Sequence, residues 1–125
     1  YMPVFNLNKL PKEKRIQMIG EFYDMIDSLK DRSEVRLFFK SLLSADEIAS
    51  FMRRIEIAML LSSGQKYEEI IKMMKVGRDK ISSVHKALLQ DDSGYAIIVE
   101  RLIANRKAWQ EKLKKENGKE KEAEK

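Results

Sequence analysis

The sequence contains no cysteine, only two prolines and only five glycines in 125 residues. The absence of cysteine excludes disulfides and thiolate zinc sites. Because proline and glycine are the main helix breakers, their scarcity leaves long stretches free to be helical. No run of about 18 apolar residues occurs, so we expect no transmembrane helix. The N-terminus lacks the apolar run of a secretory signal, and we therefore expect a cytoplasmic protein.

Net charge is also small for a chain in which 36% of the residues are charged. The formal net charge is +5 and the pI is about 9.4, which permits a nucleic-acid partner. Residues 1–43 and residues 44–90 each carry eight Lys and Arg against six Asp and Glu, and residues 91–125 carry nine against eight. The excess of positive charge is therefore small in each of these three segments. Whether the chain binds nucleic acid must be judged from the positions of basic residues within a motif.

Apolar residues recur three or four positions apart along most of the chain, which predicts an all-α multi-helix bundle. Ser44-Ala45-Asp46-Glu47 is a capping-box sequence that opens one helix, and Gly64 closes it. After a loosely structured arm over residues 1–10, the expected helices cover about 12–30, 33–43, 45–63, 67–74, 78–89 and 95–113. We expect one domain over residues 1–90, an additional amphipathic helix within 91–113, and a charged tail over 114–125 that is disordered or a frayed helix.

Residues 67–89 have the spacing of a helix-turn-helix, in which the short turn Lys75-Val76-Gly77 joins two helices. The first helix needs an apolar face toward the domain, and the second needs one apolar stripe inward and polar or basic groups outward. The inward positions of the two helices are Ile70, Ile71, Met74, Ile81, Val84 and Leu88. Two short helices joined by a glycine-containing turn also occur in ordinary helical bundles, so spacing alone leaves the function open.

A DNA major groove admits one helix, and side chains near the N-terminus of that helix contact the base edges. The base-contacting candidates are Arg78, Asp79, Lys80, Ser82 and Ser83. The phosphate-contacting candidates, which would set register and salt sensitivity, are Lys66, Lys72, Lys75, His85 and Lys86. Taken singly, such basic residues are more often only a solvated face.

The ordered combination of several short motifs resembles the tryptophan repressor superfamily. Leu42-Leu43-Ser44-Ala45-Asp46-Glu47 is similar to the LLTxxE opening of that superfamily. The positions that follow its YerC/YecD branch are Arg54, Ile57, Leu60, Leu61, Gly64, Tyr67, Ile70, and the run Ile81-Ser82-x-Val84-x-Lys86-x-Leu88. The resemblance covers about residues 37–89 and includes the whole helix-turn-helix.

This resemblance implies a sequence-specific DNA-binding transcriptional regulator, a repressor, that forms an intertwined homodimer. The helices before the DNA-contacting pair would build a core shared by two chains, and a twofold dimer would present two helices to half-sites about one helical turn apart. The candidate dimer-core residues hold more apolar surface than a chain of this length comfortably hides alone. They are Phe38, Phe39, Phe51, Met52, Ile55 and Met59.

Tryptophan-sensing members of the superfamily hold the indole between two arginines. Arg54 matches the first and is the candidate residue for an effector pocket, but Ser83 occupies the second position. We therefore expect no tryptophan corepressor and no other cofactor, and an unknown small-molecule effector stays open. The turn over residues 75–78 departs from the small-residue turn of the family, so the DNA specificity should differ. The helix over 95–113 lies beyond the usual end of the family core.

No residue constellation supports an enzyme. His85 is the only histidine, and one histidine without cysteine cannot build a typical zinc site or catalytic triad. The carboxylate pairs Asp46–Glu47 and Glu68–Glu69 are adjacent on helices and point in different directions. The alternative to a DNA-binding regulator is a helical protein-interaction module without DNA binding, in which Ile103 and Trp109 of the last helix dock on a partner.

Overall fold

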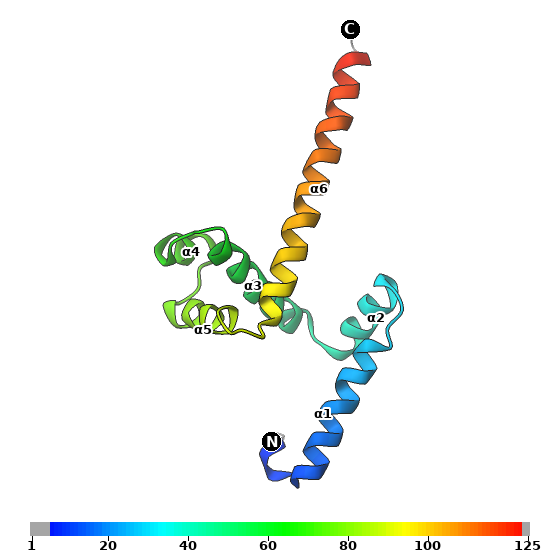
Figure 1. Ribbon diagram of the computed structural model, residues 1–125, viewed down its shortest axis with the longest axis vertical. Coiled ribbons are helices and arrows are strands. Elements are labelled where there is room, and N and C mark those ends of the chain that lie inside the picture. The colour runs from blue at the N-terminus through cyan, green and yellow to red at the C-terminus, as the bar shows by residue number, and fades with distance from the viewer. Residues whose placement is uncertain (1–5, 124–125) are drawn as a thin grey trace. The chain divides into compact units, whose positions relative to one another are not determined.

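The computed structural model describes the backbone of residues 6–123 and the side chains of residues 6–119. This part of the chain is all-helical, as the sequence predicts (Figure 1). Its elements are the short 3₁₀ helix η1 (Leu7–Lys9), α1 (Lys12–Asp27), α2 (Arg32–Leu42), α3 (Ala45–Ser62), α4 (Tyr67–Met74), α5 (Arg78–Leu88) and α6 (Gly94–Ala123). No helix of this part is long and apolar enough to cross a membrane.

Local hydrogen bonds at its two ends set the bounds of α3. The predicted capping box is confirmed, because the Glu47 amide donates to the Ser44 hydroxyl at 3.2 Å and the Ser44 amide donates to the Glu47 carboxylate at 2.9 Å. After the helix, Gly64 has a φ of +86° and the Gln65 amide donates to the Leu60 carbonyl at 3.0 Å. Gly64 thus supplies the left-handed residue that ends the helix, as predicted.

The bounds of α1 and α6 differ from the sequence prediction. Helix α1 ends at Asp27, before the predicted end at Lys30, and the Ser28 hydroxyl donates to the Met25 carbonyl of the last turn at 2.6 Å. Helix α6 continues to Ala123 and includes residues 114–123, for which the sequence left a disordered tail or a frayed helix open, and residues 124–125 lie outside the described residues. Lysine and glutamate are good helix formers, and Lys112 and Glu116 are spaced to attract each other four residues apart.

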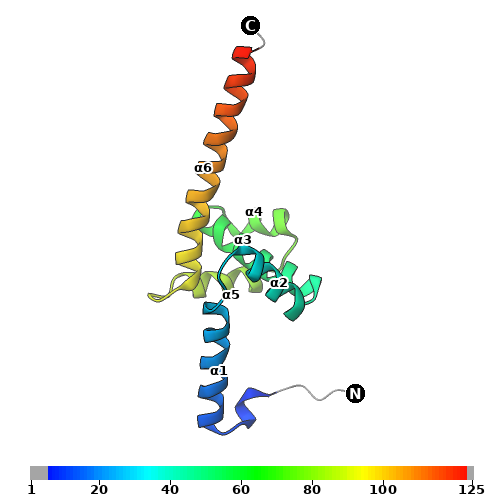
Figure 2. The ribbon, with the colours of Figure 1, turned by 90° about the vertical axis from the view of Figure 1, so that its right-hand side faces the viewer.

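The chain divides into two compact units, Tyr1–Ile48 and Ala49–Lys125, instead of one domain over residues 1–90. The second unit has a core to which α3, α4, α5 and the beginning of α6 all contribute. In both views the first part of α6 lies against the other helices of this unit, and its second part extends beyond them (Figures 1 and 2). The buried core residues are Ile57, Ala58, Met59, Ile70, Val76, Ile81, Val84 and Val99.

The described part of the first unit, in contrast, has no buried core. None of its described residues, 6–48, is buried. Several large apolar side chains on α1 are highly exposed, among them Ile16 at 62%, Tyr23 at 64% and Met25 at 53%. A surface hollow of about 470 Å³ on this helix is also lined mainly by apolar side chains, including Phe22 and Ile19. Apolar surface of this extent is typical of a segment that is completed by a partner.

We expect Ile81→Val to lower the free energy of unfolding of the protein by about 0.5–1.5 kcal/mol. The reason is that Ile81 has no exposed surface in the core of the second unit. Ile97→Val removes the same methylene from a side chain that is 52% exposed and should change the stability less. Urea unfolding of both variants at one protein concentration measures the difference, and equal losses would contradict the assignment of Ile81 to the core.

Candidate nucleic-acid interface

Helices α4 and α5 are joined by the three-residue turn Lys75-Val76-Gly77, at the predicted position. Lys75 has φ 54° and ψ 47°, so a lysine, and not the turn glycine, adopts the left-handed conformation that ends α4. Val76 is only 8% exposed and belongs to the core, whereas Gly77 has an ordinary φ of −78° at the start of α5. The buried Val76 side chain anchors the turn, and this fixes where α5 begins.

Helix α5 has one buried side and one exposed side. Ile81 and Val84 are 0% and 4% exposed and hold the helix in the core. Of the base-contacting candidates, Arg78, Asp79 and Ser83 are exposed, and Lys80 and Ser82 are half-buried. The N-terminal turn of α5 therefore presents polar side chains to solvent while its apolar stripe faces inward.

Tyr67 and Glu68 at the start of α4 hold the Arg78 side chain across the turn. The Arg78 guanidinium donates to the Glu68 carboxylate at 2.9 Å and lies 5.6 Å from the centre of the Tyr67 ring. This hydrogen bond lowers the pKa of Glu68 below its ordinary value. Both partners of the ion pair are more than half exposed, so solvent screens it and Arg78 can exchange Glu68 for another acceptor.

The same tyrosine also holds His85, which lies two turns after Arg78 on the same face of α5. The Tyr67 hydroxyl and His85 Nδ1 are 2.7 Å apart, and the two rings meet edge to face with centroids 5.7 Å apart. When the hydroxyl donates to Nδ1, the imidazole proton sits on Nε2, which leaves Nε2–H as a donor for an anion. His85, a phosphate-contacting candidate, is half-buried and oriented by this contact.

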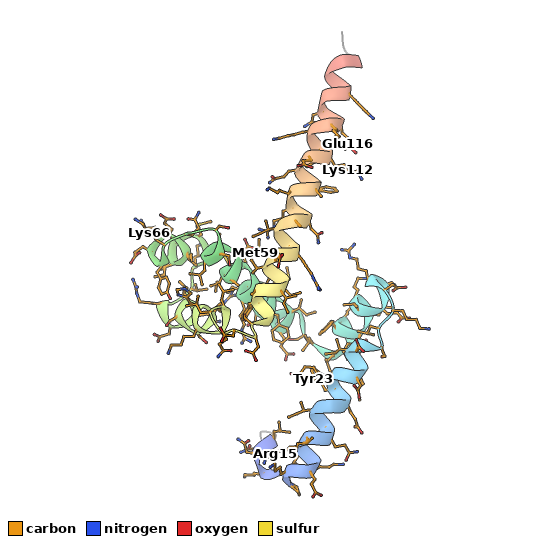
Figure 3. All side chains as sticks on the ribbon, in the orientation of Figure 1. Arg15, Tyr23, Met59, Lys66, Lys112 and Glu116 are labelled. Carbon is orange, nitrogen blue, oxygen red and sulfur yellow. The ribbon has the colours of Figure 1, made fainter. Side chains whose placement is uncertain are left out.

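The other phosphate-contacting candidates are spread around α4 and α5. Lys66 precedes the first residue of α4, as Figure 3 shows, and Lys72 and Lys75 lie at the end of that helix. Lys86 lies in the last turn of α5. All four side chains are exposed, so each can contact an anion without leaving a packed position.

Arg54, the candidate effector residue, and Ser83 line one pocket of about 220 Å³ in the second unit. Lys80, Val84, Ala87 and Tyr95 complete its lining. The pocket lies between α3, α5 and the start of α6, and the Arg54 guanidinium lies 5.7 Å from the centre of the Phe51 ring. The sequence prediction missed Tyr95, although its spacing to Val99 and Leu102 places it on the packed side of α6.

The predicted dimer-core residues divide into exposed and packed groups. Phe51 is 43% exposed and Met52 is 64% exposed, so both are available to a partner. Phe38 and Phe39 are half-buried, with ring centroids 5.5 Å apart, and Ile55 is also half-buried. Met59 is only 4% exposed, and its assignment to a shared dimer core is wrong because it faces the core of its own chain.

The described helices define an all-α protein with helix-turn-helix spacing between α4 and α5, beside a small pocket. The chain belongs to the Trp repressor protein family, whose model matches residues 17–103, and within it to the YerC-like branch. This match is longer than the resemblance seen in the sequence motifs. It reaches into α6, so the expectation that this helix lies wholly outside the family core is wrong for its first part.

Relatives and solved structures agree with this assignment. The chain is 30% identical over 84 residues to the uncharacterized protein YerC of Bacillus subtilis, which covers 67% of this chain and 81% of the relative. A TrpR-like protein from Eubacterium eligens is 31% identical with a TM-score of 0.61, covering 69% of this chain and 89% of the other. A candidate Trp repressor from Staphylococcus aureus is 26% identical with a TM-score of 0.60, covering 79% and 95%.

We expect Arg78→Gln to raise the pKa of Glu68 toward its ordinary value, because the Arg78 hydrogen bond is the largest cause of the lowered pKa. In the unaltered protein this contact therefore stabilises the fold above the ordinary pKa of a glutamate, and its contribution is lost as the pH falls through the lowered value. NMR titration of the Glu68 carboxyl measures the shift. Lys80→Gln removes the same charge from α5 and should leave Glu68 unaffected, and a pKa that rose in both variants would point to net charge as the cause.

Proposed function

We propose that the protein is a sequence-specific DNA-binding transcriptional regulator, a repressor, in which α5 enters the major groove. The observation that carries this proposal is the two-sided packing of α5. Ile81 and Val84 are buried, while Arg78 in the first turn and Ser83 in the middle of the helix are exposed. A helix wedged by its neighbour with its leading polar groups free is what contact with base edges requires. Such a regulator would act in the cytoplasm, and this role involves no catalysis.

Charge around α5 supports the same function. The exposed residues Lys66, Lys72, Lys75 and Lys86 can neutralise phosphates on either side of the groove. Tyr67 orients His85 so that its second ring nitrogen is available to a phosphate. Glu68 keeps Arg78 beside α4 until an acceptor with better geometry, such as a guanine edge, replaces the carboxylate.

The proposed active form is a homodimer. Residues 6–48 bury no side chain, although α1 and α2 carry many apolar residues. Phe51 and Met52 add exposed apolar surface at the beginning of the second unit. A second copy that covers these residues would supply the interior that the first unit lacks and would present a second α5 to the DNA.

The pocket beside α5 is the proposed site of a small-molecule effector. Its lining is cationic at Arg54 and Lys80, and Ser83 stands where an arginine would be needed to enclose an indole. Tryptophan is therefore not the proposed ligand, and its identity stays open. Because Lys80 and Ser83 are also base-contacting candidates, a ligand in this pocket would act directly on the DNA-contacting side chains.

We expect the double variant Arg78→Ala, Lys80→Ala to lose sequence preference. The two side chains are the candidates that can donate to guanine, and each good base contact discriminates by about 1–3 kcal/mol. The measurement is binding to duplexes selected from a random pool, compared with scrambled duplexes. The matched variant Lys72→Ala, Lys86→Ala should weaken binding to both kinds of duplex and make the salt dependence shallower. Unchanged footprints in the first variant would contradict the assignment of α5.

We expect the unaltered protein to have about twice the chain mass of 14.7 kDa in solution. Met52→Glu should shift it toward monomer, because Met52 is 64% exposed on the proposed interface and a buried charge would oppose association. Met73→Glu places the same charge on α4 at a residue that is 60% exposed and should leave the mass unchanged. Light scattering provides the mass, and a monomer in the unaltered chain would exclude the homodimer.

The alternative, a protein-interaction module, predicts a different pattern. It expects no duplex binding above background at low salt, and loss of partner binding when Trp109 or Ile103 is changed. These residues are 60% and 39% exposed and are accessible to a partner. The selection experiment separates the two functions, since an interaction module would enrich no duplex sequence.

A further inference from the structure

The net positive charge of the chain is concentrated on one part of α6. Residues 101–119 hold seven Lys and Arg against two Asp and Glu, a net charge of seven minus two, or +5. The whole chain also has a net charge of +5, so the remaining residues are neutral in sum. The net charge of residues 91–125 as a whole is only +1, because the acidic residues of 91–100 and 120–124 offset the basic residues between them.

Four of these cations lie on one side of the helix. Lys112, Lys115 and Lys119 follow each other at spacings of three and four residues, which places them on one face. Arg101 precedes Lys112 by about three full turns and lies on the same face. From Arg101 to Lys119 this face is about 27 Å long, at about 1.5 Å per residue. The two carboxylates flank this basic face, and each lies four residues from one of its lysines, Glu116 from Lys112 and Glu111 from Lys115.

Three of these four cations, Lys112, Lys115 and Lys119, belong to the part of α6 that the core does not hold, and Arg101 is exposed on the packed part. Tyr95, Val99 and Leu102 pack in the second unit, and Arg106 donates to Glu56 of α3 at 2.8 Å. From Lys107 to Lys119 every side chain is exposed. Lys112 and Glu116 lie on α6 beyond the end that packs against α3 (Figure 3). Residues 107–119 therefore form an exposed, charged part of α6 that follows the packed part of the helix.

We propose that the basic face of α6, formed by Arg101, Lys112, Lys115 and Lys119, is a second DNA-contacting surface that binds the phosphate backbone of the duplex. This inference rests on the proposed function, and it adds a contact outside the helix-turn-helix. The argument is charge complementarity, since duplex DNA carries one negative charge per about 1.7 Å of axis and a row of lysines neutralises phosphates without base specificity. The surface adds affinity and salt dependence, while α5 supplies the sequence preference.

The test compares two triple variants of the full chain that remove equal charge. Lys112→Gln, Lys115→Gln, Lys119→Gln alters the basic face, and Lys12→Gln, Lys14→Gln, Lys30→Gln alters exposed lysines of the first unit. Binding to a long random-sequence duplex is measured as a function of salt. If all three lysines of α6 contact phosphates, the slope of log K against log salt becomes shallower by about two to three in the first variant. The control variant should keep the slope of the unaltered protein.

Trp109 provides an independent readout, because it is the only tryptophan, is 60% exposed, and lies three residues before Lys112. Added duplex should shield its fluorescence from acrylamide in the unaltered protein and in the control, and shield it less in the α6 variant. An unchanged slope in the α6 variant, or equal changes in both variants, would overturn the inference while leaving the proposed function intact. If Trp109 is already shielded from acrylamide without DNA and the salt slope of the α6 variant is unchanged, this face would be a protein contact. Failure of the unaltered chain to bind any duplex would contradict both proposals together.

Discussion

The structure depends on the burial of three isoleucines, one from each of three successive helices. Ile57 of α3, Ile70 of α4 and Ile81 of α5 have no exposed surface and belong to one cluster. Because each of the three helices contributes one fully buried side chain, the cluster holds the three helices together. Because the inner stripe of α5, the anchored turn before it and the contacts of Tyr67 and Glu68 hold the helix, Asp79 and Ser83 stay exposed. The packing of the core therefore determines which side of α5 is exposed, and this exposed side is the proposed DNA-contacting surface.

The two units differ in how much of their apolar surface they bury. The second unit closes around its own core, whereas no residue in the described part of the first unit is fully buried. Tyr67 shows how polar groups complete the second unit, since one side chain contacts both Arg78 and His85. The apolar residues of α1 have no such closure within the described chain. This difference is the reason for proposing a homodimer, in which a second copy would cover these residues.

The local features of the fold could be predicted from the sequence, and the features that depend on distant residues could not. The Ser44–Glu47 box and Gly64 act through hydrogen bonds within a few residues, so their helix ends were correct. The Glu68–Arg78 pair joins residues ten apart across a turn, and no periodicity indicates it. Met59 continues an apolar stripe in sequence, but only the packing of the other helices decides that it faces its own core. The pocket combines Arg54 with Tyr95 for the same reason.

Lys75 occupies a backbone conformation that glycine adopts more easily. For a residue with a Cβ atom the left-handed region is less favourable by about 1–2 kcal/mol. A glycine at this place would relieve the strain, yet it would remove a cation from the tip of the turn. Conformational ease and attraction for anions thus oppose each other at a single residue, so selection for heat resistance and selection for tight duplex association would favour different amino acids there.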